Sequence, residues 1–205
     1  KLYPSSDRGK IVELKEAVEP QLSRNNRPFW FTYGIQRGGT EVTEEPTGIN
    51  SVQVIAGRSI SIGWIGESVG WVDLDMVRER PYGKLSLWTE QMHEKFLVVT
   101  NIGLAPTASL VTNGAIAAVD SLIIALPKVN LDPKIVVTYI NSKLARFYYL
   151  VRLRTGVLAG SSRAHVYPRV LEAMPWVKKL NSSIEQRLVD NYNELARLAA
   201  IAKDN

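Results

Sequence analysis

The stretch YINSKLARFYY, residues 139–149, decides the fold because its apolar residues recur at helical spacing. Asp132 and Pro133 lie just upstream, where an aspartate can cap a first helical turn and a proline costs no hydrogen bond. We therefore expect one buried helix from Asp132 to about Arg154. We also expect Asn141 and Ser142 to allow close packing or to bond locally. The apolar stripe repeats at about 100° per residue through Val136, Ile140, Leu144, Phe147 and Val151.

The chain that follows this helix is basic. Between Lys143 and Leu171 there are six Lys or Arg residues and no Asp or Glu, a charge of +6 that exceeds the +5 of the whole chain. Gly156 and Gly160 let backbone N–H groups approach a phosphate. We interpret the loop as an anion-binding segment, whose candidate contacts to phosphates or base edges are Arg154, Ser161, Ser162, Arg163 and His165. The alternative is that these arginines lie along apolar surface or are simply solvated.

Two smaller basic groups precede the helix. Arg37 and Arg58 each follow an expected strand in a turn, where a side chain can project from a rigid base. The second group lies in a charged surface excursion that also contains acids, and consists of Arg78, Arg80 and Lys84. A pI near 9.4 points to a polyanionic partner, since Lys and Arg gain affinity for nucleic acid by releasing counterions.

Upstream of the helix the pattern is that of short strands. We expect strands over 29–35 and 95–103, a β-meander with tight turns over 51–73, and a hairpin around Asn113 and Gly114. Residues 40–50 are polar and acidic, and we expect a loop there. Residues 10–24 have helical spacing, although Pro20 should break or end that helix.

The last segment is expected to be a packing helix. Ser182 and Glu185 have the spacing of a capping box, in which each side chain bonds an otherwise unpaired backbone N–H. Its apolar residues alternate steps of 4 and 3, which is typical of a helix pair and requires a partner surface. These residues are Leu188, Tyr192, Leu195, Ala199 and Ala202.

The residue types exclude several catalytic classes. The sequence has no cysteine and two histidines, so structural zinc, thiolate catalysis and disulfides are not expected. It contains neither a P-loop nor the histidine pair of a metalloprotease. Glu13 and Lys15 fit part of a nuclease motif, but a solvated helix face explains them better. No apolar run suits a membrane span or a signal peptide, and the missing initial Met leads us to expect an excerpt of a longer polypeptide.

The order of short motifs resembles the C-terminal specificity domain of TaqI-like adenine-N6 DNA methyltransferases and bifunctional restriction–modification enzymes. It is also similar to the related target recognition domain of Type I specificity subunits. The resemblance covers roughly residues 29–177. Its motifs are a glycine turn, a strand with Gly-Arg, a Lys-led apolar strand, an Asn-Ser-Lys helix and a closing apolar segment. They correspond to Gly34–Gln36, Gly57–Ile60, Lys95–Gly103, Asn141–Lys143 and Leu171–Trp176.

The resemblance implies a mixed α/β domain that binds double-stranded DNA and positions it for a separate adenine-N6 methyltransferase or restriction–modification domain. We expect an α+β fold with a twisted, mainly antiparallel sheet of short strands, a central buried helix and a C-terminal helix. Three parts are expected: a peripheral helix and linker at 1–28, the target recognition domain at 29–177, and a packing helix at 178–205.

The resemblance also adds Gln36 to the DNA-binding candidates, because Gln can read adenine as Arg reads guanine. The N-P-P-Y motif and a glycine-rich cofactor loop are absent from the sequence. We therefore expect this chain alone to be no enzyme and to need no cofactor or metal. S-adenosylmethionine would bind only to the catalytic domain, in the same or a partner polypeptide, and we expect a cytoplasmic protein without membrane contact. The alternative is a protein-interaction module that docks through its C-terminal helix and has an incidental basic surface.

Overall fold

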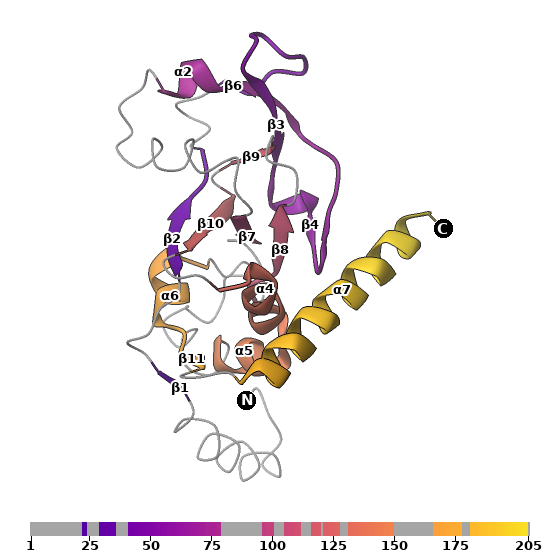
Figure 1. Ribbon diagram of the computed structural model, residues 1–205. Helices are drawn as coiled ribbons and strands as arrows, with labels where there is room; N and C mark the ends of the chain where they lie inside the picture. Colours follow the sequence, from indigo (N-terminus) through magenta and orange to yellow (C-terminus); the bar gives the residue numbers. More distant parts are fainter. Residues whose placement is uncertain are drawn as a thin grey trace, which may run out of the picture.

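The computed structural model describes residues 22–23, 29–35, 41–78, 96–100, 105–111, 116–119, 121–127, 131–149, 166–177 and 181–204. Helices and mainly antiparallel sheets make up this part of the chain, which confirms the expected α+β class (Figure 1). None of the helices in the described ranges has the length and hydrophobicity that crossing a bilayer requires.

A four-stranded sheet forms the middle of the molecule, and all of its neighbouring strands are antiparallel. Strands are confirmed within both expected ranges, 29–35 and 95–103; the first ends at Tyr33, and in the second the structure describes residues 96–100. In spatial order the sheet consists of β2 (Phe29–Tyr33), β10 (Leu122–Pro127), β7 (Phe96–Thr100) and β8 (Ala108–Val111).

Strand β10 is buried on both faces, and its alternating side chains separate two apolar cores. Ile123 and Ala125 belong to the core that the helices cover, whereas Leu122 and Ile124 belong to the core formed with a second sheet. All four side chains are fully buried. Burial on both faces requires apolar side chains on both, and these four consecutive residues are all apolar.

The second sheet has the strand order β6-β3-β9. Its members are β6 (Gly70–Asp73), β3 (Ser51–Ile55) and β9 (Ile116–Ala118), and β3 is antiparallel to β6 but parallel to β9. A short hairpin of β4 (Ile60–Ser61) and β5 (Trp64–Ile65) separates β3 from β6 in the chain. The expected meander over 51–73 is therefore wrong, because β3 pairs across this hairpin instead of with the next strand.

The hairpin expected around Asn113 and Gly114 is also wrong. Strand β8 pairs with β7 in the four-stranded sheet, whereas β9 pairs with β3 in the other sheet. Strand β8 is buried along its whole length. Burial against neighbouring elements outweighs a local turn preference in deciding which strands pair.

The central helix is broken at Ser142, so the single helix expected from Asp132 to about Arg154 is wrong in this respect. It forms α4 (Pro133–Asn141) and α5 (Lys143–Tyr148), with Ser142 extended between them at φ −69° and ψ 153°. The Ser142 Oγ accepts a hydrogen bond from the Ala145 backbone N–H at 3.1 Å and so caps α5. The start is as expected, because the Asp132 carboxylate accepts a hydrogen bond from the Lys134 N–H at 2.9 Å.

The break at Ser142 shifts the buried face of the helix. Val136 and Ile140 are buried as the expected stripe requires. Beyond the break, Ala145 is buried instead, whereas Leu144 and Phe147 are only half-buried. The residue before the break, Asn141, hydrogen-bonds through its side chain to Ala108 on β8 rather than within its own helix.

Helix α6 (Pro168–Ala173) and strand β11 (Trp176–Val177) close the helical core. Trp176 packs against Tyr139, with 4.9 Å between ring centroids, and against Phe31 at 6.5 Å. Strand β11 pairs with β1 (Leu22–Ser23). The end of the helix expected over 10–24 is therefore a strand, and the rest of that range lies outside the described residues.

Helix α7 (Ser182–Asp204) packs against α4, contacts the β4–β5 hairpin beside Gly63 at Leu195 and Ala196, and extends beyond the sheets at its C-terminal end (Figure 1). Tyr192 is buried in the helical core. The expected capping box is wrong, because Asn181 caps the helix: its side-chain oxygen accepts a hydrogen bond from the Ile184 N–H at 2.8 Å. The expected seam is only partly covered. Leu195 remains 38% exposed.

Candidate nucleic-acid interface

The end of β2 is held rigidly by backbone contacts. The Gly34 N–H donates to the Leu122 carbonyl at 3.1 Å, and the Ile35 N–H donates to the Ala118 carbonyl at 2.7 Å. A Cβ at Gly34 would overlap the carbonyl oxygens of Ala118 and Val119. Only glycine fits this close approach, which gives a steric reason for glycine at this position.

Helix α6 presents a tyrosine and an arginine on the surface. Its buried residues, Leu171 and the flanking Val166 and Met174, fix it against the helical core. Tyr167, at the N-cap, is 41% exposed, and the Arg169 guanidinium lies over its ring at 5.6 Å from the ring centroid. This distance is that of a cation–π contact, which holds the guanidinium in place at the surface.

The end of β2 lies beside α6, which brings a second tyrosine to this place (Figure 1). Phe29 and Phe31 point into the helical core, and strand alternation puts Tyr33 on the same face, where it is 43% exposed. Burial raises the pKa of Tyr33, and nearby Tyr167 raises it further, whereas Arg169 lowers it. We call Tyr33, Tyr167 and Arg169 the tyrosine–arginine cluster.

Sequence reasoning missed both tyrosines, and it counted Arg169 in the basic segment without making it a DNA-binding candidate. One signal was available for Tyr33: it falls at the exposed end of a strand whose other residues on that face, Phe29 and Phe31, are buried. Tyr167 directly precedes a proline that opens a helix. No sequence pattern indicates that these two distant tyrosines come together, because the contact depends on how α6 packs on β2.

Most residues predicted to contact DNA lie outside the described residues, and their roles stay predictions. They are Gln36, Arg37, Arg80, Lys84, Arg154, Ser161, Ser162, Arg163 and His165.

Arg58 and Arg78 fall within the described part of the chain, at different places. Arg58 is exposed on a short 3-10 helix, η3 (Gly57–Ser59), which precedes β4, and the Gly57 N–H fixes it by donating to Ser121 Oγ at 3.0 Å. Arg78 is the last residue of α2 (Leu74–Arg78), and only its backbone is described. Because β4, α2 and α6 lie far apart in Figure 1, neither arginine joins the tyrosine–arginine cluster.

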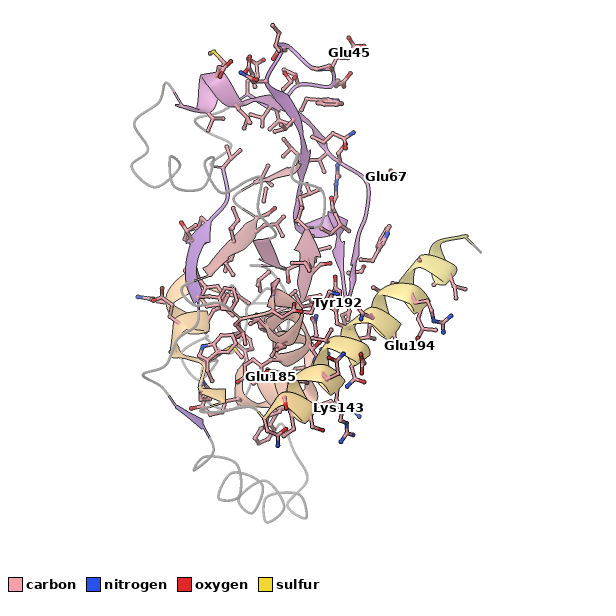
Figure 2. The ribbon with its side chains drawn as sticks, viewed as in Figure 1. Glu45, Glu67, Lys143, Glu185, Tyr192 and Glu194 are labelled. Carbon is pink, nitrogen blue, oxygen red and sulfur yellow. The ribbon has the colours of Figure 1, made fainter. Side chains whose placement is uncertain are left out.

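Several of the described residues near α2 are acidic. Glu44 and Glu45 are exposed in the loop before β3, and Figure 2 places Glu45 at the same end as α2, away from α6. Asp73 caps α2 by accepting a hydrogen bond from the Asp75 N–H at 3.0 Å. Carboxylates repel DNA phosphates. The role predicted for Arg78 stays a prediction, because its side chain is not described.

The described residues contain no group of three side chains that could hold a metal ion. Comparison with models of known protein families finds no match for this chain, and no curated protein matches its sequence significantly. The resemblance to target recognition domains therefore rests on the sequence motifs alone.

Proposed function

We propose that this chain is a sequence-specific double-stranded DNA recognition module. It positions target DNA for a separate adenine-N6 methyltransferase or restriction–modification domain, which would bind S-adenosylmethionine. The observation that supports this most directly is the meeting of β2 and α6. Gln36 follows Tyr33 by three residues, and His165 precedes Tyr167 by two, so the two segments predicted to read DNA connect to one place.

This arrangement suits DNA recognition because reading bases requires side chains on a rigid base. The backbone bonds of Gly34 and Ile35 hold one segment, and the buried Val166 and Leu171 hold the other. Between Lys143 and Leu171 no acid interrupts the positive charge. Phosphate contacts would set the position of the duplex, and Gln36, Arg154 and Arg163 would be available for base edges.

The proposal is tested by binding of the full chain to a fluorescent 30-base-pair duplex library of random sequence. We expect binding at low salt, with an affinity that falls steeply as salt rises. Arg154→Ala and Arg163→Ala should each weaken binding without lowering the melting temperature. Arg187→Ala is the matched control, because Arg187 is an exposed arginine on α7. Absence of binding at low salt, or an affinity independent of salt, would show that the proposal is wrong.

A second candidate function, protein docking through α7, is favoured by one observation. Leu195, Leu198 and Ile201 are 38%, 48% and 47% exposed and follow one another at helical spacing. A stripe of large apolar side chains on a helix that extends beyond the sheets is suited to packing against a helix of a catalytic partner domain. Under this alternative, Leu198→Ser would abolish capture of the partner domain, while DNA binding would be absent from the chain altogether.

A further inference from the structure

We infer that the tyrosine–arginine cluster is a binding site for a backbone phosphate of duplex DNA, with Arg169 as the main ligand and the Tyr33 hydroxyl as a second donor. This inference rests on the proposed function and deepens it, because it names residues and a chemical group that the sequence did not assign. Unlike the loop residues that the sequence predicts to contact DNA, Tyr33, Tyr167 and Arg169 lie within the part of the chain that the structure describes.

The position of Arg169 suits a phosphate ligand. Its side chain is exposed, and the contact with the Tyr167 ring at 5.6 Å restricts its guanidinium before any ligand arrives. A planar guanidinium can donate two parallel hydrogen bonds to phosphate oxygens. Because an ordered side chain loses less entropy on binding than a free one, this arrangement favours affinity.

The same geometry argues against stacking of a base on Tyr167. The guanidinium covers one face of the ring, so that face is not available to a nucleobase. The N–H groups at the edge of the guanidinium remain available to bind an anion. Tyr33 adds a neutral hydroxyl: a phenol with the ordinary pKa of about 10 keeps its proton at neutral pH, and burial raises the pKa of Tyr33 further, so the hydroxyl can donate to phosphate.

The cluster also adjoins the most positive part of the sequence. Arg169 is the last of the six basic residues between Lys143 and Leu171. The nearest acid along α6, Glu172, is half-buried. The exposed Glu45, by contrast, lies at another end of the molecule in Figure 2.

The test measures binding of wild-type chain and variants to the random 30-base-pair duplex library across a salt series. Arg169→Gln should weaken binding about fivefold at low salt and reduce the slope of log affinity against log salt by about 1, as loss of one phosphate contact requires. Arg169→Lys should keep the salt slope and lose only part of the affinity, because a lysine keeps the charge but not the paired donors. Tyr33→Phe should weaken binding about twofold.

The control is Arg187→Gln, which removes the same charge from exposed α7. If Arg169→Gln and Arg187→Gln have equal affinities and salt slopes while the wild-type chain binds DNA, the phosphate site is wrong and the proposed function stands. If the wild-type chain does not bind, the proposed function itself is wrong. Selection of preferred sequences from the library should give the same sequence for wild type and Arg169→Gln, since phosphate contacts do not read bases. A changed preference would overturn the phosphate assignment in favour of a base contact.

Discussion

The side-chain amide of Asn141 pairs with both backbone groups of Ala108, accepting from its N–H at 3.0 Å and donating to its carbonyl at 2.8 Å. Ala108 belongs to β8, the edge strand of the four-stranded sheet. One side chain at the end of α4 thus satisfies the two groups that a further strand would otherwise bond. It protects this edge and ties the helix to the sheet.

Replacing Asn141 should therefore destabilise the fold. We expect Asn141→Ala to lower the free energy of unfolding by about 2 kcal/mol, because two half-buried hydrogen bonds are lost and two backbone groups are left without partners. Urea denaturation followed by circular dichroism measures this loss. The control is Asn191→Ala, at an exposed position of α7, which should cost less than about 0.5 kcal/mol. Equal losses for the two variants would contradict the role of Asn141.

Gly34→Ala should be more damaging than alanine at another glycine. A Cβ at Gly34 would overlap two backbone carbonyls that hydrogen bonds hold in place, so the sheets would have to separate. We expect a loss of about 3 kcal/mol in the free energy of unfolding. At Gly57 the nearest atom to a new Cβ is the Ser121 carbonyl oxygen at 3.3 Å, and small shifts can accommodate it. Denaturation curves in which Gly57→Ala costs as much as Gly34→Ala would contradict this account.

At position 142 we expect glycine to be tolerated better than alanine. The Ser142 Oγ caps α5, and the residue has extended backbone angles. Ser142→Ala should cost about 1 kcal/mol in the free energy of unfolding, because the Ala145 N–H loses its acceptor. Ser142→Gly should cost only a few tenths of a kcal/mol on the same principle. The reverse order, measured by thermal or urea unfolding, would mean that Ser142 continues the helix in solution.

Stability should fall at alkaline pH. Burial raises the pKa of Tyr139, and nearby Tyr148 raises it further; burial and Asp132 likewise raise the pKa of Tyr192. A raised pKa means that the folded state favours the protonated phenol. This contribution is complete below the ordinary pKa of about 10 and is lost as the pH rises through the folded-state pKa values.

The effect of Tyr139 can be separated with Tyr139→Phe. Its hydroxyl donates to the Pro175 carbonyl, so the variant should lose about 1 kcal/mol at pH 7. Between pH 9 and 11, however, its stability should fall less steeply than that of the wild type. Urea denaturation at a series of pH values measures both effects. Parallel stability curves for the two proteins would show that Tyr139 contributes nothing to the alkaline loss.

The sequence predicted the features that depend on residues close together in the chain. Asp132 and Pro133 mark the start of α4, and aromatic or apolar runs mark β2 and β7. Strand pairing could not be predicted in the same way, because it depends on which faces become buried together. The Asn-Gly turn signal at 113–114 indicated a hairpin, yet the flanking strands β8 and β9 belong to different sheets. The break at Ser142 was missed because the apolar spacing continues across it.

The candidate site was predictable to a similar extent. Charge counting located a basic segment, and a glycine stands at position 34, where the structure leaves no room for a Cβ. Charge alone could not distinguish Arg169, which lies on a tyrosine ring beside β2, from an exposed arginine such as Arg187 on α7. That distinction requires the tertiary contact between α6 and β2.

The place of β10 between β2 and β7 also constrains how a nascent chain can fold. Both neighbours precede β10 in the sequence, and Tyr33 can pair with Ile123 only after the whole of the intervening chain has been made. A ribosome-bound fragment that ends before Leu122 would present β2 without a pairing strand on its β10 side and neither apolar core complete. Strands that wait for distant partners fold slowly and associate with other chains. Production of this domain should therefore depend on chaperone capacity during synthesis more than on the stability of the finished fold.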